Sequence, residues 1–474
     1  MKTAFTWYCS GLNKSPVELL YYLDPYGCAK NQVDAENMMA RLNDAGWSAA
    51  ENPENADLII VNSCGFIESA KQESINAVLE WRKLYPEKKI LLAGCLAQRY
   101  AHELAEALPE ADGFFGVDDL PGIAEAAGKT MAGKCDKACG KKPAREGAPI
   151  AERKTAGPGS RPLLSLPGSA YVKISEGCDN RCSFCAIPLI RGGIRSRAIR
   201  ELTEECKTLL RRGIKELCLI GQDTGSYGKD FAGDSGSAVS SGLPALMEAL
   251  SRLEGDFWVR ILYIHPDHFP LPILDMMDKD KRFLPYFDIP FQHASEKILK
   301  NMNRRLDVES YLELIETIRR RLPDAVIRST FMTGFPGETE EDFTLLLDFQ
   351  KKARLDWLGC FVYSREENTA AYAMKGRVGK KTAIARKSLI EERQIPITEN
   401  QISRFVGRTF DVLVEEKFDS PPDEAFLYLG RLPCQAPEVD GAAVIFSPRS
   451  LELGSKVPCR VIAARGFDLE VCPL

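Results

Sequence analysis

The sequence has little of several features that would place it in a specialised class of protein. No apolar run approaches the roughly 20 residues that a transmembrane helix needs. The first residues contain one lysine but soon turn polar, so they lack the apolar core of a secretory signal peptide. The formal net charge of −5 over 474 residues gives no general attraction to nucleic acid or to acidic membranes. These absences predict a globular cytoplasmic protein with no membrane partner.

Histidine is also scarce, whereas cysteine is abundant. The chain has four histidines and fifteen cysteines. Disulfides are rare in the reducing cytoplasm, and a structural zinc site takes four Cys or His ligands. So many cysteines without a secretion signal therefore indicate metal clusters held by thiolates rather than covalent cross-links.

The most informative stretch, residues 171–197, begins with a predicted strand and continues with three cysteines in close order. Cys178, Cys182 and Cys185, which we call the loop cysteines, are spaced C-x-x-x-C-x-x-C. Three thiolates can hold three corners of a four-iron cluster and leave the last iron open to another ligand. The alternatives are a disulfide with a spare thiol, and a zinc site, which would need a fourth ligand from a chain with few histidines.

Residues 19–131 repeat one pattern three times and form the first predicted domain. Apolar segments at 19–23, 57–61 and 89–93 are each followed by a polar turn and a helical pattern. Strand, turn and helix in alternation predict a parallel sheet that is covered by helices.

Each of these units carries one cysteine just beyond its strand. We call these three, Cys28, Cys64 and Cys95, the sheet cysteines. The carboxyl ends of parallel strands open on one crevice, and helix N-termini there favour thiolates. A free cysteine is often a small buried hydrophobic residue, which is the alternative for each one taken alone. Three cysteines at the same topological position, however, predict a second cluster site.

Both cysteine sets stand in segments that resemble the methylthiotransferase family of the radical S-adenosylmethionine (SAM) superfamily. In the first domain the similarity covers G-C-A-K-N-Q-V-D-A-E at 27–36, N-S-C-G-F-I-E-S-A at 62–70 and G-C-L-A-Q-R-Y at 94–100. The resemblance implies two 4Fe-4S clusters, one on each cysteine set. It implies that SAM binds the open iron beside the loop cysteines, with Phe184 near the adenine. The cluster on the sheet cysteines would carry the sulfur to be transferred.

Residues 168–402 form the second predicted domain, in which strands and helices alternate on a larger scale. Helical patterns occur at 311–322 and 340–353. They lie among six predicted strands, at 170–175, 217–220, 258–263, 286–289, 326–332 and 358–363. This alternation predicts a partial (β/α)6 barrel whose site lies at the carboxyl ends of the strands.

Polar loops that contain glycine follow several of these strands, as at 221–228 and 334–339. In the resembled superfamily such loops hold the methionine moiety and the ribose of SAM. The resemblance therefore implies SAM contacts for Gln222, Arg328 and Glu338. No side chain is an obvious catalytic acid or base, and we assign none.

Residues 403–474 read as five short strands separated by turns, which predicts a small β-barrel and resembles the TRAM domain. The segment from residue 401 has eight Arg or Lys residues against eleven Asp or Glu, a net charge of −3. RNA binding relies on lysine and arginine to neutralise phosphates, so direct contact with nucleic acid is not expected. An acidic barrel suits a basic protein partner, although a merely solvated surface is the alternative.

The overall fold class is therefore α/β, with a small β-barrel at the carboxyl end of the chain. A connector at 132–167, rich in Gly, Ala, Pro and Lys, separates the first two domains. We assign no function to Cys135 and Cys139 in this connector, or to residues 1–18.

Three further segments resemble the family branch that modifies a protein: G-Q-D-T-G-S-Y-G at 221–228, D-I-P-F-Q-H-A-S at 288–295 and A-P-E-V-D-G at 436–441. That branch adds a methylthio group to the β-carbon of an aspartate in the twelfth protein of the small ribosomal subunit. An enzyme of that branch would need an electron donor of the flavodoxin or ferredoxin type. The alternative branch modifies an adenosine in tRNA. A non-catalytic iron–sulfur carrier or an RNA-binding scaffold is a further alternative, but two cysteine sets and a barrel are more than a carrier needs.

Overall fold

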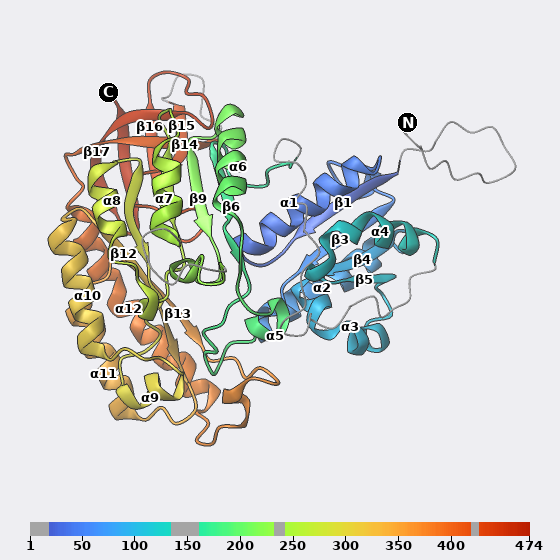
Figure 1. Cartoon of the computed structure of the whole chain (residues 1–474), viewed down its shortest axis with the longest axis horizontal. Coiled ribbons are helices and arrows are strands. Elements are labelled where there is room, and N and C mark those ends of the chain that lie inside the picture. Colours follow the sequence, from blue (N-terminus) through green and yellow to red (C-terminus); the bar gives the residue numbers. More distant parts are fainter. Residues whose placement is uncertain (1–18, 134–160, 232–241, 419–425) are drawn as a thin grey trace, which may run out of the picture.

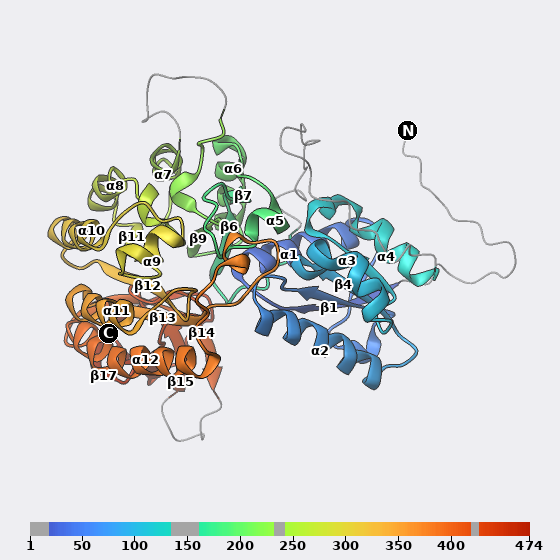
Figure 2. The ribbon, with the colours of Figure 1, turned by 90° about the horizontal axis from the view of Figure 1, so that it is seen from below.

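The structure is a computed structural model that describes residues 19–133, 161–231, 242–418 and 426–474 (Figure 1). Three units follow one another along the chain, as the sequence predicts. The first lies to one side of the other two, which pack closely together (Figure 2). Cys135 and Cys139, and residues 1–18, lie outside the described residues. Among the described residues, no helix is long and apolar enough to cross a bilayer.

The first unit is a five-stranded parallel sheet with the strand order β2-β1-β3-β4-β5. Its strands are β1 (Leu20–Pro25), β2 (Ser48–Ala49), β3 (Leu58–Ser63), β4 (Lys89–Gly94) and β5 (Gly113–Phe115). Helices cover both faces: α1 (Ala29–Asp44), α2 (Glu68–Leu84), α3 (Cys95–Ala107) and α4 (Ile123–Met131). The three predicted strands are present. The sequence did not show β2 and β5, because segments of two and three residues are too short for a pattern.

The second unit is a six-stranded parallel sheet in the order β13-β12-β11-β10-β9-β6, which confirms the predicted partial barrel. Its strands are β6 (Ser169–Lys173), β9 (Glu216–Ile220), β10 (Trp258–Ile261), β11 (Phe283–Asp288), β12 (Val326–Thr333) and β13 (Trp357–Val362). The outer helices are α6 (Ile199–Arg211), α7 (Leu243–Ser251), α8 (Ile273–Lys279), α10 (Val308–Arg321), α11 (Glu340–Ala353) and α12 (Lys380–Ser403). Their apolar faces and the outward faces of the strands form the largest core.

Short elements surround the segment that carries the loop cysteines. The strands β7 (Ser175–Glu176) and β8 (Arg195–Ser196) pair antiparallel and close this segment at its base. Between them lies the short helix α5 (Ile187–Arg191), and α9 (Glu296–Asn301) follows β11.

The third unit is a closed five-stranded barrel, as predicted, with the strand order β14-β15-β16-β18-β17. The strands are β14 (Thr409–Phe418), β15 (Phe426–Arg431), β16 (Ala443–Ser447), β17 (Lys456–Arg465) and β18 (Asp468–Pro473). Its core is continuous with residues near the starts of the second unit's strands. The barrel therefore covers the end of the second unit opposite to the carboxyl ends of its strands.

A buried network of ion pairs joins these two units. Glu216 of β9 accepts from Arg260 at 2.7 Å and from Arg431 of β15 at 2.5 Å. Arg431 also pairs with Glu415 of β14 at 2.6 Å. Burial raises the pKa of Glu216, but Arg431 and Arg260 outweigh burial and lower it to about 2. Glu216 is therefore ionised, and it compensates two buried guanidinium groups.

We expect Glu216→Gln to lower the free energy of unfolding by about 3–5 kcal/mol, because it leaves two buried cations without their shared anion. Chemical unfolding of the intact chain measures this loss. Since the native pKa of Glu216 is depressed, its stabilisation is present above pH 4.5 and is lost as the pH falls toward about 2. The matched control is Glu204→Gln, at an exposed pair with Lys207, and should leave the stability nearly unchanged because solvent screens that pair. Equal effects of the two variants would contradict the structural role of the network.

Candidate active site

The sheet cysteines lie at the carboxyl ends of three neighbouring strands. Cys28 precedes α1, Cys64 follows β3, and Cys95 is the first residue of α3. Their loops are in contact: a Cβ added at Gly27 would lie 3.1 Å from the Cβ of Cys64. A Cβ added at Gly65 would lie 2.7 Å from the carbonyl oxygen of Cys95. The structure thus brings together three cysteines that are far apart in the sequence.

The guanidinium of Arg191, at the end of α5, lies against this site. It is 1% exposed, and its Nη2 donates to the sulfur of Cys95 at 3.1 Å and to Asn31 Oδ1 at 2.9 Å. It also pairs with Asp34 of α1 at 2.9 Å and with Glu176 of β7 at 2.6 Å. One side chain therefore links the segment of the loop cysteines to the domain of the sheet cysteines.

The local charges act differently on the sheet cysteines. Burial raises the pKa of the Cys95 thiol to about 12, in spite of the nearby Arg191. Burial also acts to raise the pKa of Cys28, but Lys30 and Arg191 outweigh it and lower the pKa overall. Metal ligands must be deprotonated. The cations Lys30 and Arg191 beside these thiols would stabilise an anionic group that is bound by thiolates.

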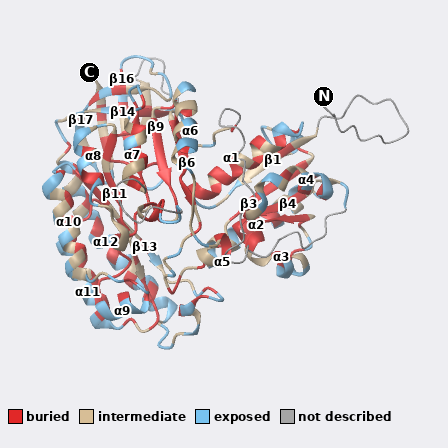
Figure 3. Ribbon diagram, in the orientation of Figure 1, coloured by how far each residue is buried: buried red, intermediate tan, exposed pale blue. Residues whose placement is uncertain are grey.

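Lys30 lies two residues after Cys28 and points into the space between the two domains. Its side chain is buried, and Nζ lies 3.4 Å from the ring centroid of Tyr263, which follows β10. Figure 3 shows α1, which carries Lys30, as a largely buried helix between the first sheet and the second unit. Burial lowers the pKa of Lys30, and the Cys28 thiolate opposes this shift.

The loop cysteines are held in one compact turn. The backbone nitrogen of Cys185 donates to the carbonyl of Cys182 at 3.0 Å, and that of Cys178 donates to Gly192 at 3.1 Å. Gly177 has a φ of 71°, and a Cβ there would lie 2.0 Å from the carbonyl oxygen of Gly193. No other residue type fits that position, because the backbone approaches too closely.

Burial raises the pKa values of all three loop cysteines, that of Cys178 to about 12. Without metal these thiols are therefore neutral, and binding a cluster releases protons. Among the described residues, no group of three ligands could hold a single metal ion. Ligands of one ion must all lie about 2.3 Å from it, whereas the cysteines of a cube bind different irons. Three cysteines in each set are the donor type that an iron–sulfur cluster takes.

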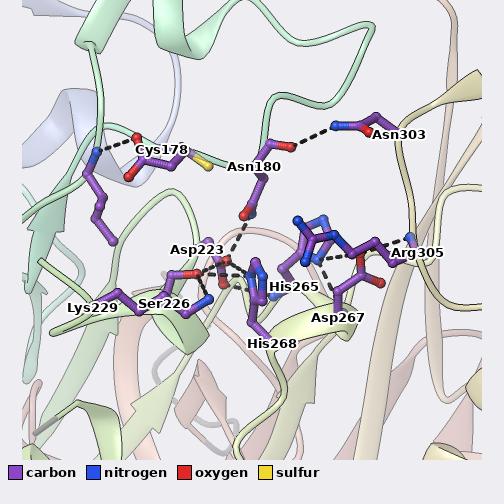
Figure 4. Close-up of a pocket in the computed structure, with 12 residues that line it drawn as sticks. Cys178, Asn180, Asp223, Ser226, Lys229, His265, Asp267, His268, Asn303 and Arg305 are labelled. Atoms are coloured by element: carbon purple, nitrogen blue, oxygen red, sulfur yellow. Dashed lines mark hydrogen bonds and ion pairs between the residues drawn. The ribbon is translucent and has the colours of Figure 1, made fainter. Parts of the chain in front are cut away.

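A cavity of about 240 Å³ opens beside Cys178 and Asn180, at the carboxyl ends of β9 and β10 (Figure 4). Asp223 lies at its centre and accepts from Asn180 Nδ2 at 2.9 Å, Ser226 Oγ at 2.6 Å and His268 Nδ1 at 2.8 Å. The hydrogen bond from Asn180 fixes the cysteine loop to the end of β9. Asp223 thus orients this loop.

His265 also lies beside the loop. Its Nε2 accepts from Arg304 at 2.6 Å and lies 3.9 Å from the sulfur of Cys182. Burial and the charge of Arg304 lower the pKa of His265 far below its usual value, so the ring is neutral. His293, which lies in the segment 288–295, is buried, and its Nδ1 accepts from the backbone nitrogen of Ser295 at 3.0 Å.

Three of the four residues expected to contact SAM lie near the loop or near strand carboxyl ends. Phe184 packs in an apolar cluster with Cys182 and Cys185. Gln222 follows β9, and its buried Nε2 has no hydrogen-bond partner among the described residues. Glu338 follows β12, accepts from the backbone of Gly334 at 2.8 Å and also binds Arg386.

Arg328 lies elsewhere. It is near the start of β12, five residues before the strand ends at Thr333, which is roughly 16 Å along a strand. It pairs with Asp288 of β11 at 3.1 Å and lies 3.5 Å from Asp440 of the small barrel. The structure therefore does not place Arg328 beside the loop cysteines, and its contact with SAM stays a prediction.

Arg191 and Lys30 are the residues that the sequence did not single out. Both stand next to the cysteine motifs, Lys30 two residues after Cys28 and Arg191 six residues after Cys185. This closeness to the cysteine motifs is the one feature of the sequence that could have indicated a role for the two residues. Their partners, such as Asp34 and Tyr263, come from other domains or other turns, and no local pattern indicates such contacts.

Three segments of the chain match known families. Residues 20–116 match the uncharacterized protein family UPF0004, residues 172–349 the radical SAM superfamily and residues 406–472 the TRAM domain. The chain is 47% identical to the ribosomal protein uS12 methylthiotransferase RimO of Treponema denticola, over 94% of this chain and 99% of that protein. It is 40% identical to the RimO of Syntrophomonas wolfei, over 94% and 97% of the two chains.

Among solved structures, the radical SAM methyltransferase TsrM of Kitasatospora setae, with cobalamin and a 4Fe-4S cluster bound, has a TM-score of 0.52 to this chain. The two are 15% identical, and the match covers 75% of this chain and 74% of that one. At this identity the likeness shows a shared fold.

We expect Gly65→Ala to destabilise the first domain by about 1–3 kcal/mol, because the new methyl group meets the backbone of Cys95 and overpacks the site. Chemical unfolding of the intact chain measures the change. The control is Gly128→Ala in α4, where a Cβ meets nothing within 4 Å. It should be neutral or stabilising by up to about 1 kcal/mol, the usual preference of a helix for alanine. If Gly65→Ala is as stable as the control, the loops that carry Cys64 and Cys95 do not pack tightly against each other.

Proposed function

The chain belongs to the RimO family of ribosomal protein uS12 methylthiotransferases, and we propose that it adds a methylthio group to the β-carbon of an aspartate in uS12. It is a radical SAM enzyme and a transferase. The identities to RimO proteins over nearly the whole chain are the main support. The observation that carries the proposal is the placement of two cysteine sets on either side of Arg191.

We assign one 4Fe-4S cluster to the loop cysteines and a second to the sheet cysteines. When bound, the two clusters supply an electron for cleaving SAM and the sulfur that is transferred. We assign the domains to residues 19–131, 168–402 and 403–474, with the connector at 132–167. We further propose a cytoplasmic setting and an electron donor of the flavodoxin or ferredoxin type.

The side chains of the chain bind, orient and exclude water. Asp223 and Asn180 fix the loop cysteines, which would hold the cluster, against the end of β9. Phe184 and its apolar neighbours, among them Phe335 and Met302, keep water away from SAM. Arg191 fixes the distance between the two cysteine sets, because it binds residues of both segments. We assign no side chain as a general acid or base.

The small barrel supports a protein substrate over the tRNA alternative. Several of its basic side chains are already paired with acids: Arg408 with Asp324, Lys456 with Asp256, and Arg465 with Glu470. Paired cations neutralise phosphates poorly, and RNA binding depends on that neutralisation. An acidic barrel is suited to a basic ribosomal protein.

Substitution of one cysteine in each set should separate the two steps. We expect Cys182→Ala to abolish SAM cleavage, and Cys64→Ala to keep SAM cleavage but abolish methylthio transfer. In each variant, iron after anaerobic reconstitution should fall from about eight to about four per chain. The control is Cys472→Ser in β18, which should keep the iron content and both steps. A Cys64→Ala variant that still transfers sulfur would show that sulfur does not come from that site.

The substrate can be tested directly with the purified enzyme. We expect mass spectrometry to detect an added methylthio group on uS12 after incubation with SAM and a reductant, and none on tRNA. The reason is the acidic barrel, which attracts a basic protein and repels phosphates. Modification of tRNA alone would overturn the assignment of uS12 as the substrate.

A further inference from the structure

Lys30 is a buried cation beside Cys28, and among the described residues no carboxylate pairs with it. It is 7% exposed, and among the described residues its Nζ makes no hydrogen bond and no ion pair. The amine lies instead over the ring of Tyr263, at 3.4 Å. A buried ammonium group is costly unless an anion compensates it. A contact with an aromatic ring recovers only part of the free energy that removing a charge from water costs.

The carboxylates near Lys30 are each bound to another cation. Asp288 pairs with Arg328 at 3.1 Å. Glu176 pairs with Arg191 at 2.6 Å and with Lys173 at 2.6 Å. Asp34 of α1 likewise binds Arg191 and Lys173. None of these carboxylates is available to Lys30, so apart from the Cys28 thiolate its charge is left for a ligand.

The position of Lys30 is set by two rigid elements. It stands in the first turn of α1, where the helix N-terminus also favours an anion. Tyr263 lies just past β10 with a φ of 64°, a conformation that is rare for a tyrosine and costs free energy. This backbone holds the ring under the amine. Lys30 is therefore a fixed group between the sheet cysteines and the carboxyl ends of the barrel strands.

We propose that Lys30 binds the side-chain carboxylate of the substrate aspartate and selects aspartate over asparagine. This inference rests on the proposed function, since it takes an aspartyl side chain as the substrate. The β-carbon of aspartate is bonded directly to the carboxylate carbon, so an ion pair with Lys30 fixes that carbon next to Cys28. Lys30 is thus a specificity-determining residue that presents the reacting carbon to the sheet cysteines.

Other cations near the site are less suitable for this role. Arg191 already binds Asp34, Glu176 and Asn31. Arg328 is bound to Asp288 and lies toward the small barrel. Either would have to break an existing ion pair before it could bind the substrate. Lys30 would gain its first ion pair.

The test compares two peptides on each enzyme variant. One peptide is the uS12 segment with its target aspartate, and the other has asparagine at that position. Binding is measured with the anaerobically reconstituted enzyme, and kcat and KM are measured separately. Because both peptides meet the same preparation, differences in folding or iron content cancel in the ratio of their affinities.

We expect the wild-type enzyme to bind the aspartate peptide more tightly than the asparagine peptide. Lys30→Met should weaken binding of the aspartate peptide on the order of 10- to 100-fold and leave the asparagine peptide unchanged, because only the charged hydrogen bond is lost. Lys30→Arg keeps the charge and should restore part of the preference.

Lys71→Met is the matched control. The amine of Lys71 also lies over a tyrosine ring, that of Tyr100, but it is already paired with Glu68 at 2.8 Å and with Glu366 at 3.2 Å. Its loss should not change the preference for aspartate.

Two results would overturn the inference. If Lys30→Met weakens the binding of both peptides equally, or changes only the iron content, Lys30 acts on the sheet cysteines rather than on the substrate. If the variant keeps the wild-type preference, another group reads the carboxylate. A wild-type enzyme that modifies neither the peptide nor intact uS12 would instead overturn the proposed function, and the inference with it.

Discussion

The buried guanidinium of Arg191 contacts both segments on which the chemistry depends. It leaves α5, which directly follows the loop cysteines, and reaches Cys95, Asn31 and Asp34 in the first domain. A buried arginine tolerates little displacement, because each lost partner leaves a desolvated charge. The two cysteine sets are therefore held at one separation.

Parallel strands explain why the convergence of the three sheet cysteines could be predicted from the sequence. Each sheet cysteine follows a strand, and strand carboxyl ends meet at one edge, so the order of strands and turns along the chain already predicts that Cys28, Cys64 and Cys95 converge. Arg328 shows the limit of this reasoning. Its place on a strand was predictable, but its distance from the strand end and its partner Asp440 were not. Contacts between domains, such as Lys30 with Tyr263, leave no periodic signal in either segment.

Burial makes both cysteine sites dependent on their metal. The thiols of Cys95 and Cys178 have pKa values raised to about 12, so an empty site holds neutral thiols in an apolar setting. Binding a cluster must deprotonate them, and part of the binding free energy is spent on this step. Nearby cations reduce that cost at the sheet cysteines, where Arg191 and Lys30 lie. The loop cysteines have Arg304 at a comparable position.

Recognition of the substrate can be divided between two electrostatic features of opposite sign. The acidic barrel acts at long range on the net charge of a basic protein, which raises the rate of encounter but does not distinguish one side chain from another. A single buried cation acts at short range, where the low dielectric makes a missing charge costly. A buried lysine can therefore reject an uncharged side chain on a partner that the barrel has attracted. The two features work together because the first brings a basic surface and the second accepts a carboxylate on it.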